Sequence, residues 1–149
     1  MFNDYAEYEK KVEAIQFANK ALLEEFSEYL TRKGLTPKTI NIHINNVEFY
    51  INEYLCYEDA LEAKDGFGEL GMYFGDFFVR KASWSSCAQL KSNAASIKKF
   101  YAFMLEKGEI TKDKYDRLID SIKDRMEDWL SNMQLYIDDP DAYYDDIYL

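Results

Sequence analysis

Apolar residues recur at intervals of three and four along most of the chain, the spacing that places them on one face of an α-helix. The first segment with this pattern runs from Tyr5 to Ile15 and predicts a short amphipathic helix. A second helix is expected to begin after Asn19, whose side chain can act as N-cap, and to end at Lys33 before Gly34. The pattern therefore predicts two helices before residue 34.

The clearest helix start of the chain lies at Thr36 and Pro37. A threonine oxygen can accept hydrogen bonds from the free backbone N–H groups of a first turn, and proline suits the first helical position because it has no N–H to leave unpaired. The helix that follows is expected to bury a stripe formed by Ile40, Ile44, Val47, Ile51 and Leu55. Its opposite side is expected to carry Lys38, Asn41, Asn45 and Asn52.

The middle of the chain predicts a connector and two more helices. Residues 56–67 form the connector, which is expected to contain one helical turn, and residues 69–81 form a strongly apolar helix. Ser83 or Ser85 is expected to cap the next helix, which ends at Lys107-Gly108. The buried stripe of this helix is expected to consist of Cys87, Leu90, Ala94, Ile97, Tyr101, Met104 and Leu105.

Thr111 is expected to cap a last helix with a long and regular apolar stripe. That stripe either completes the core, or part of it projects beyond the domain to meet a partner chain. It consists of Tyr115, Leu118, Ile119, Ile122, Met126, Trp129, Leu130 and Met133. Two Pro, six Gly and few β-branched runs leave little material for strands, so we expect an all-α fold.

The stretch from Leu22 to Tyr50 resembles the opening of a known domain. Phe26 and Tyr29-Leu30 precede Lys33-Gly34-Leu35-Thr36-Pro37-Lys38-Thr39-Ile40. This order is similar to the start of the N-terminal core-binding domain, often called SAM-like, of phage integrases and other tyrosine recombinases. A second resemblance follows in the helix after Ser85, where Ser92-Asn93-Ala94-Ala95-Ser96-Ile97-Lys98-Lys99-Phe100-Tyr101-Ala102-Phe103-Met104 is similar to another part of the family pattern.

The resemblance is strongest over residues 19–110 and implies a particular fold and role. The fold would be a SAM-like orthogonal bundle of four to five helices, with an extra N-terminal helix and a long C-terminal helix. We expect a single domain over residues 1–137, followed by an acidic tail over residues 138–149. In the family this domain forms half of a clamp around duplex DNA, so duplex DNA is the expected partner, with a separate recombinase or a second copy of the chain as further partners.

Catalysis is not expected. A tyrosine recombinase needs two Arg, a Lys and His residues at the phosphate and a Tyr nucleophile. His43 is the only histidine, Asn46 stands where the family's His-x-x-Arg motif has Arg, and the chain stops before a catalytic domain would fit. No spacing indicates a metal or a cofactor, so we expect neither.

The cysteine content and the lack of long apolar runs indicate the redox state of the thiols and the compartment of the protein. Cys56 and Cys87 are too few and too far apart for a metal knuckle, and both lie near apolar stripes, so we expect reduced, packed thiols. No run approaches the length of a membrane span, and the first residues lack the features of a signal peptide. We therefore expect a cytoplasmic protein with no membrane contact.

The formal net charge of −10 argues against nonspecific wrapping of nucleic acid, because such binding depends on neutralising phosphates. The positive charges are nevertheless segregated. No acidic residue lies between Glu28 and Glu48 or between Asp76 and Glu106, and these two windows contain eight of the 18 Lys and Arg residues. Both helices that resemble the family pattern lie in these windows.

On the second of these helices, Lys91, Lys98 and Lys99 are expected to share the outward side with small residues, namely Ala88, Ser92 and Ala95. Lysines can contact phosphate or guanine, and asparagines can read adenine edges. The resemblance implies DNA contacts for Arg32, Lys33, Lys38, Asn41, Asn45, Lys91, Lys98 and Lys99.

Other interpretations stay open at this point. The lysines can simply keep a helix face solvated. Ile42 and Phe49 point away from the Ile40 stripe, which favours a protein-interaction or dimerisation module that has lost DNA binding. The acidic tail is either a solvated end or a segment that folds back over the lysines and competes with DNA.

Overall fold

The computed structural model describes residues 2–81, 85–139 and 141, and within these ranges it contains helices and no strand. This confirms the all-α prediction. The four long helices are α1 (Phe2–Arg32), α2 (Pro37–Glu48), α5 (Cys87–Lys107) and α6 (Lys112–Asp138). Between α2 and α5 lie a π-helical segment (Phe49–Tyr54), a 3-10 helix (Ala63–Glu69), α3 (Leu70–Met72), a second π-helical segment (Tyr73–Phe77) and α4 (Phe78–Lys81).

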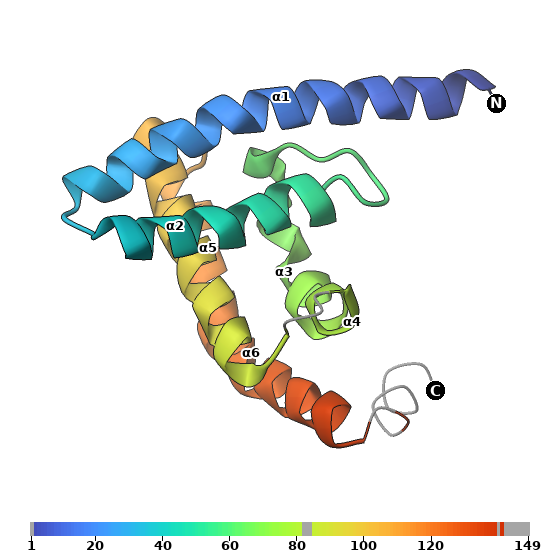
Figure 1. The fold of residues 1–149 in the computed structure, drawn as a ribbon, viewed down its shortest axis with the longest axis vertical. Helices are drawn as coiled ribbons and strands as arrows, with labels where there is room; N and C mark the ends of the chain where they lie inside the picture. The colour runs from blue at the N-terminus through green and yellow to red at the C-terminus, as the bar shows by residue number, and fades with distance from the viewer. Residues whose placement is uncertain (1, 82–84, 140, 142–149) are drawn as a thin grey trace.

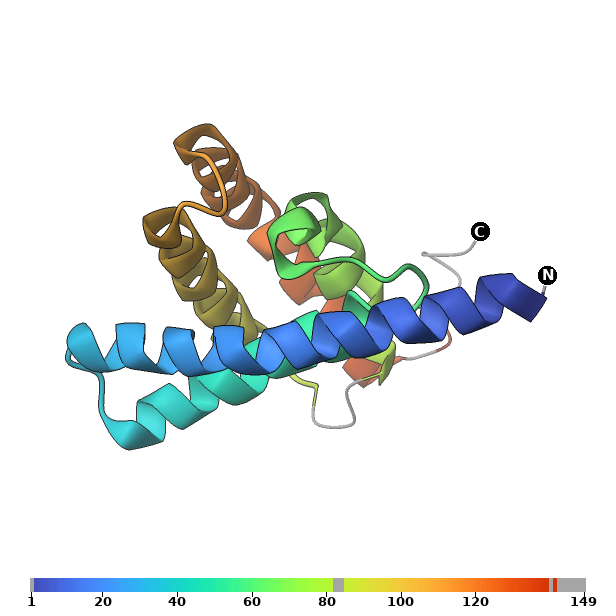
Figure 2. The ribbon, with the colours of Figure 1, turned by 90° about the horizontal axis from the view of Figure 1, so that it is seen from above.

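The long helices pack as two antiparallel pairs (Figure 1). α1 and α2 lie side by side and run in opposite directions, and α5 crosses α2 and is followed by α6, which runs back along it (Figures 1 and 2). α3 and α4 flank the second π-helical segment, which packs against the first π-helical segment and against α6. The first turns of α1 extend past the rest of the molecule in both views. None of the helices within the described ranges is both long enough and apolar enough to cross a membrane.

The N-terminal region is one helix and not two. α1 runs without a break through Asn19, so the predicted N-cap at this residue is wrong. The Asn19 side chain is instead buried, and its Nδ2 donates to Oδ1 of Asn52 at 2.8 Å. Asn52 is half-buried by this contact and does not lie on the outward side of its helix, as the spacing had predicted.

The predicted helix ends are largely confirmed. Thr36 caps α2 by accepting a hydrogen bond from the backbone N–H of Thr39, and Thr111 caps α6 by accepting from that of Lys114. Gly108 ends α5 with a φ of 87°, a left-handed conformation that suits glycine. The cap of α5 is Ser86, which accepts from the backbone N–H of Gln89.

The predicted α5 caps therefore need correction. The Ser85 hydroxyl donates to the carbonyl oxygen of Val79 at 3.3 Å and does not cap α5. Ser83 lies outside the described residues, as does most of the expected acidic tail, of which residues 138, 139 and 141 are described.

Two π-helical segments bring aromatic side chains together from both sides of the core. Phe49 and Phe77 have ring centroids 5.9 Å apart, Tyr50 and Tyr73 are 5.0 Å apart, and Tyr54 is 4.9 Å from Phe77. Phe49 is half-buried because the rings of Tyr73 and Phe77 pack against it, and the prediction that it forms an exposed apolar surface with Ile42 is wrong.

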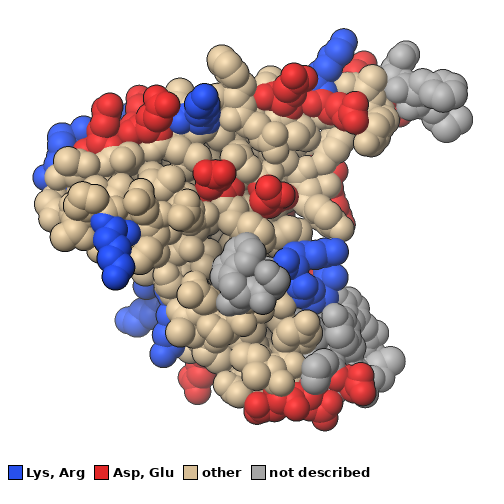
Figure 3. Space-filling model, viewed as in Figure 1, with Lys and Arg blue, Asp and Glu red and all other residues tan. Residues whose placement is uncertain are grey.

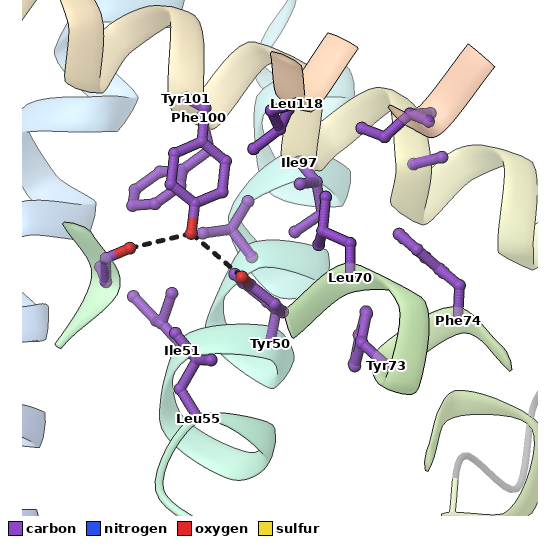
Figure 4. Packing of buried hydrophobic residues seen from close by; sticks show 14 of the residues in the cluster. Tyr50, Ile51, Leu55, Leu70, Tyr73, Phe74, Ile97, Phe100, Tyr101 and Leu118 are labelled. Carbon is purple, nitrogen blue, oxygen red and sulfur yellow. Dashed lines mark hydrogen bonds between the residues drawn. The ribbon is translucent and has the colours of Figure 1, made fainter. Parts of the chain in front are cut away.

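Hydrogen-bonded tyrosines stabilise the centre of the core (Figure 4). The Tyr101 hydroxyl donates to the carbonyl oxygen of Ala63 at 2.8 Å and lies 3.0 Å from the Tyr50 hydroxyl. Tyr50 can donate in turn to the carbonyl oxygen of Gly66 at 2.9 Å. A Cβ atom at Gly66 would lie 2.5 Å from the Tyr50 hydroxyl, so the close approach of this backbone requires glycine.

The last helix completes the core. Leu118, Ile122, Trp129 and Met133 of α6 are buried, and the remaining residues of the predicted stripe are half-buried against the same cluster. Of the two alternatives, a stripe that completes the core and a stripe that partly projects beyond the domain, the described residues therefore show the first. Both cysteines are free; Cys56 is buried and Cys87 is half-buried, as expected for packed thiols.

Candidate nucleic-acid interface

The two helices from the acid-free windows, α2 and α5, pack directly on each other through polar side chains. His43 Nδ1 lies 2.7 Å from Oγ of Ser96, and Asn46 Nδ2 donates to Oγ of Ser92 at 3.1 Å and to that of Ser96 at 2.9 Å. Ser96 is fully buried and His43 is nearly so. These contacts fix the two helices relative to each other.

His43 and Ser96 share a buried hydrogen bond in which either atom can be the donor, depending on the tautomer of the ring. The Ser96 oxygen also accepts from Asn46 and lies 3.1 Å from the carbonyl oxygen of Ser92. Burial lowers the pKa of His43, and the charge of Lys99 lowers it further. The folded protein therefore favours the neutral imidazole.

Most of the residues predicted to contact DNA are accessible. All are exposed except Lys98, which is half-buried. Among the described residues, none of these lysines and arginines has an ion-pair partner within 4.0 Å. Their charges are thus available to an external anion. The exposed set is Arg32, Lys33, Lys38, Asn41, Asn45, Lys91 and Lys99.

Three of the predicted lysines meet in one groove. Lys33, at the end of α1, lines a groove of about 400 Å³ together with Lys98 and Lys99 of α5. Tyr29 and Tyr115 line the same groove, and no acidic side chain does. Its other lining residues are Leu30, Leu35, Ala102 and Ile119. We call this feature the lysine groove.

The two tyrosines of the lysine groove each lie under a lysine. The Lys33 ammonium is 5.4 Å from the ring centroid of Tyr29, and the Lys112 ammonium is 5.9 Å from that of Tyr115. Such cation–π contacts hold a lysine without neutralising its charge. The groove therefore combines positive charge with aromatic walls. The Lys112 ammonium beside it is paired with the carboxylate of Asp116 at 2.6 Å.

Arg32 faces a different part of the surface. It lines a separate groove with Glu25, Glu28 and Glu106, in which the acidic side chains outnumber the basic ones. Of the eight predicted residues, Arg32 therefore has the surroundings least favourable to a phosphate.

Basic and acidic side chains lie over different helices on one face of the molecule (Figure 3). The charged side chains over the N-terminal end of α2 and along the adjacent side of α5 are lysine or arginine. Carboxylates gather along α1 and over the C-terminal end of α6. The net negative charge of the chain therefore does not extend over the whole surface.

The sequence did not predict the polar contacts between α2 and α5 or the tyrosines of the lysine groove. Ser92 was expected to face outward, but it is half-buried by its contact with Asn46. The spacing of His43 with Asn46 and of Ser92 with Ser96 was a usable signal, because each pair lies on one helix face. Tyr115 was assigned to the core stripe, and its position beside the lysines depends on how α6 packs.

No protein-family model, curated protein or solved structure matches this chain. The family therefore stays a prediction from the residues quoted above. The functional argument depends on the geometry of α2, α5 and the lysine groove.

Proposed function

We propose that this chain is a non-catalytic domain that binds duplex DNA through α2, α5 and the lysine groove, in the manner of an integrase core-binding domain. In this proposal α1, α2, α5 and the segments between them form the SAM-like bundle. The domain acts alone or beside a separate recombinase in the cytoplasm.

The observation that carries the proposal is the joining of two acid-free sequence windows into one surface. The His43–Ser96 and Asn46–Ser92 contacts, between residues 53 and 46 positions apart in the sequence, bring the helices of the two windows together. Lysines from both windows line one groove that contains no carboxylate. A solvated helix face would not require lysines from separate elements to converge, so the convergence favours an anionic ligand.

The side chains divide into two roles. Lys33, Lys98 and Lys99 in the groove, with Lys38 on α2 and Lys91 on α5, supply phosphate contacts, which give affinity but little sequence information. Asn41 and Asn45 are exposed on α2 and can hydrogen-bond adenine edges if this helix enters the major groove.

Charge reversal tests the proposal directly. Changing Lys91, Lys98 and Lys99 to Glu is expected to abolish binding of a fluorescent duplex at low salt, measured by anisotropy. The matched control changes Lys64, Lys114 and Lys123 to Glu, since these exposed lysines lie outside the groove and the control has the same net charge.

The comparison between the two triple variants decides the outcome. Binding that survives in the control and disappears in the α5 variant, with Lys91, Lys98 and Lys99 changed, supports the proposal. Equal losses in both variants would mean that only net charge matters, and unaffected binding by the α5 variant would place the binding surface elsewhere. Circular dichroism shows whether each variant has kept its helices.

A further inference from the structure

The outer face of α1 presents an apolar side chain that no other part of the described chain covers. Phe17 is 82% exposed, the largest exposure among the exposed large apolar side chains of the described residues. Ala14 and Ala21, about one turn to either side, are exposed as well. The opposite face of α1 supplies Ile15, Leu23 and other residues to the core, so this face has no role in the fold.

Charged residues flank Phe17 in an ordered way. Lys10 and Glu13 precede it, and Lys20 and Glu24 follow it, all on the same exposed face. None of the four has an ion-pair partner within 4.0 Å among the described residues. Lys10 and Glu24 lie seven residues before and after Phe17, and Glu13 and Lys20 lie four before and three after it. Each matching pair combines one positive and one negative charge.

The charges on this face of α1 are complementary to those of a second α1 helix that runs in the opposite direction. In an antiparallel pair of α1 helices related by a two-fold axis at Phe17, the residue seven before Phe17 faces the residue seven after it in the other copy. Lys10 then meets Glu24 of the second copy, and Glu13 meets Lys20. On the other edge Ala14 meets Ala21, which allows the helices to approach closely. A parallel pair would instead oppose like charges at every one of these positions.

We propose that α1 forms an antiparallel interface with a second copy of this chain, centred on Phe17. Each dimer buries two Phe17 rings and forms four interchain ion pairs, two of each kind. The α1 residues of the lysine groove, Tyr29 and Leu30, are buried on the core side of the helix, away from Phe17, so the interface leaves the groove accessible. The dimer carries two copies of the lysine groove related by the two-fold axis.

The full chain tests this interface by sedimentation velocity over a concentration series. Phe17→Asp is expected to yield only monomer, because it places a charge at the centre of the interface. Glu13→Lys and Lys20→Glu are each expected to weaken the dimer roughly tenfold, because each replaces two attractive pairs with two repulsive ones. Lys11→Glu, on the same helix but off this face, serves as the control and is expected to dimerise like the unaltered chain.

A mixture of the two single variants makes the test specific. Glu13→Lys has lysine at both positions and Lys20→Glu has glutamate at both, so a heterodimer between them restores the opposite charges. The mixture is expected to associate more tightly than either variant alone, and the double variant in one chain is expected to recover the original affinity.

Two results would overturn the proposal. One is an unaltered chain that stays monomeric up to millimolar concentration in low salt. The other is a dimer that Phe17→Asp leaves intact, or whose charge variants fail to complement each other in the mixture. Circular dichroism on every variant checks that α1 is still helical.

Discussion

Two buried tyrosines of the same core are expected to respond in opposite ways to loss of their hydroxyl groups. Tyr101 donates to the carbonyl oxygen of Ala63 at 2.8 Å and contacts the Tyr50 hydroxyl at 3.0 Å. Among the described residues, the Tyr73 hydroxyl is the one buried side-chain polar atom without a hydrogen-bond partner. Phenylalanine keeps the ring and removes only the hydroxyl, so the two substitutions isolate the hydrogen bonds.

The expected magnitudes follow from the contacts. Tyr101→Phe removes the donor to the Ala63 carbonyl oxygen and the partner of the Tyr50 hydroxyl. This loss is expected to lower the free energy of unfolding by about 2 kcal/mol. Tyr73→Phe removes a desolvated hydroxyl that gains nothing in return, which is expected to leave the free energy of unfolding unchanged or raise it by about 1 kcal/mol. For a domain of this size, about 1 kcal/mol corresponds to roughly 3 °C in Tm.

Urea denaturation followed by circular dichroism measures both changes, and Phe74→Leu, at a neighbouring core residue with no hydroxyl, calibrates the cost of altered packing. The reasoning would be refuted if Tyr73→Phe destabilised the protein as much as Tyr101→Phe, because the Tyr73 hydroxyl would then have a partner. A neutral Tyr101→Phe would equally refute it.

Two further substitutions test the geometry of the core and of the α2–α5 contact. Gly66→Ala is expected to cost at least about 2 kcal/mol in denaturation, because its Cβ would lie 2.5 Å from the Tyr50 hydroxyl and force it to move; a neutral result would show that this approach is loose. The unaltered protein is expected to lose stability as the pH falls below the ordinary histidine pKa of about 6.5, since the folded state holds the pKa of His43 lower and the unfolded state therefore binds more protons. His43→Gln should reduce the slope of stability against pH in that window, and an unchanged slope would exclude His43 as its source.

Helix ends with local signals could be predicted from the sequence. Thr36, Thr111 and Gly108 act within one turn of their own positions, so each boundary depends on neighbouring residues alone. Asn19 has the same chemistry as an N-cap, but its partner Asn52 lies 33 residues away, and no local pattern reveals that contact. A buried polar pair therefore looks like a helix boundary when only the sequence is considered.

The element that covers a helix face is equally hidden in the sequence. Phe49 lies on the same helix face as Ile42, and its ring is half-buried because Tyr73 and Phe77, from a later segment, pack against it. The candidate site was likewise predicted only in part. Its lysines were identified from acid-free windows, whereas Tyr29 and Tyr115 became part of it only through the packing of α1 and α6 around α5.

The central claim is that the lysines of α2, α5 and the lysine groove bind DNA phosphates, and the salt dependence of duplex binding tests it most directly. With five lysines each contacting one phosphate, the logarithm of the association constant should fall against the logarithm of salt concentration with a slope of about −4.5. Changing Lys91, Lys98 and Lys99 to Gln should flatten that slope by about 2.7. No binding by the unaltered chain at the lowest salt, or a slope that the three substitutions leave unchanged, would contradict the claim.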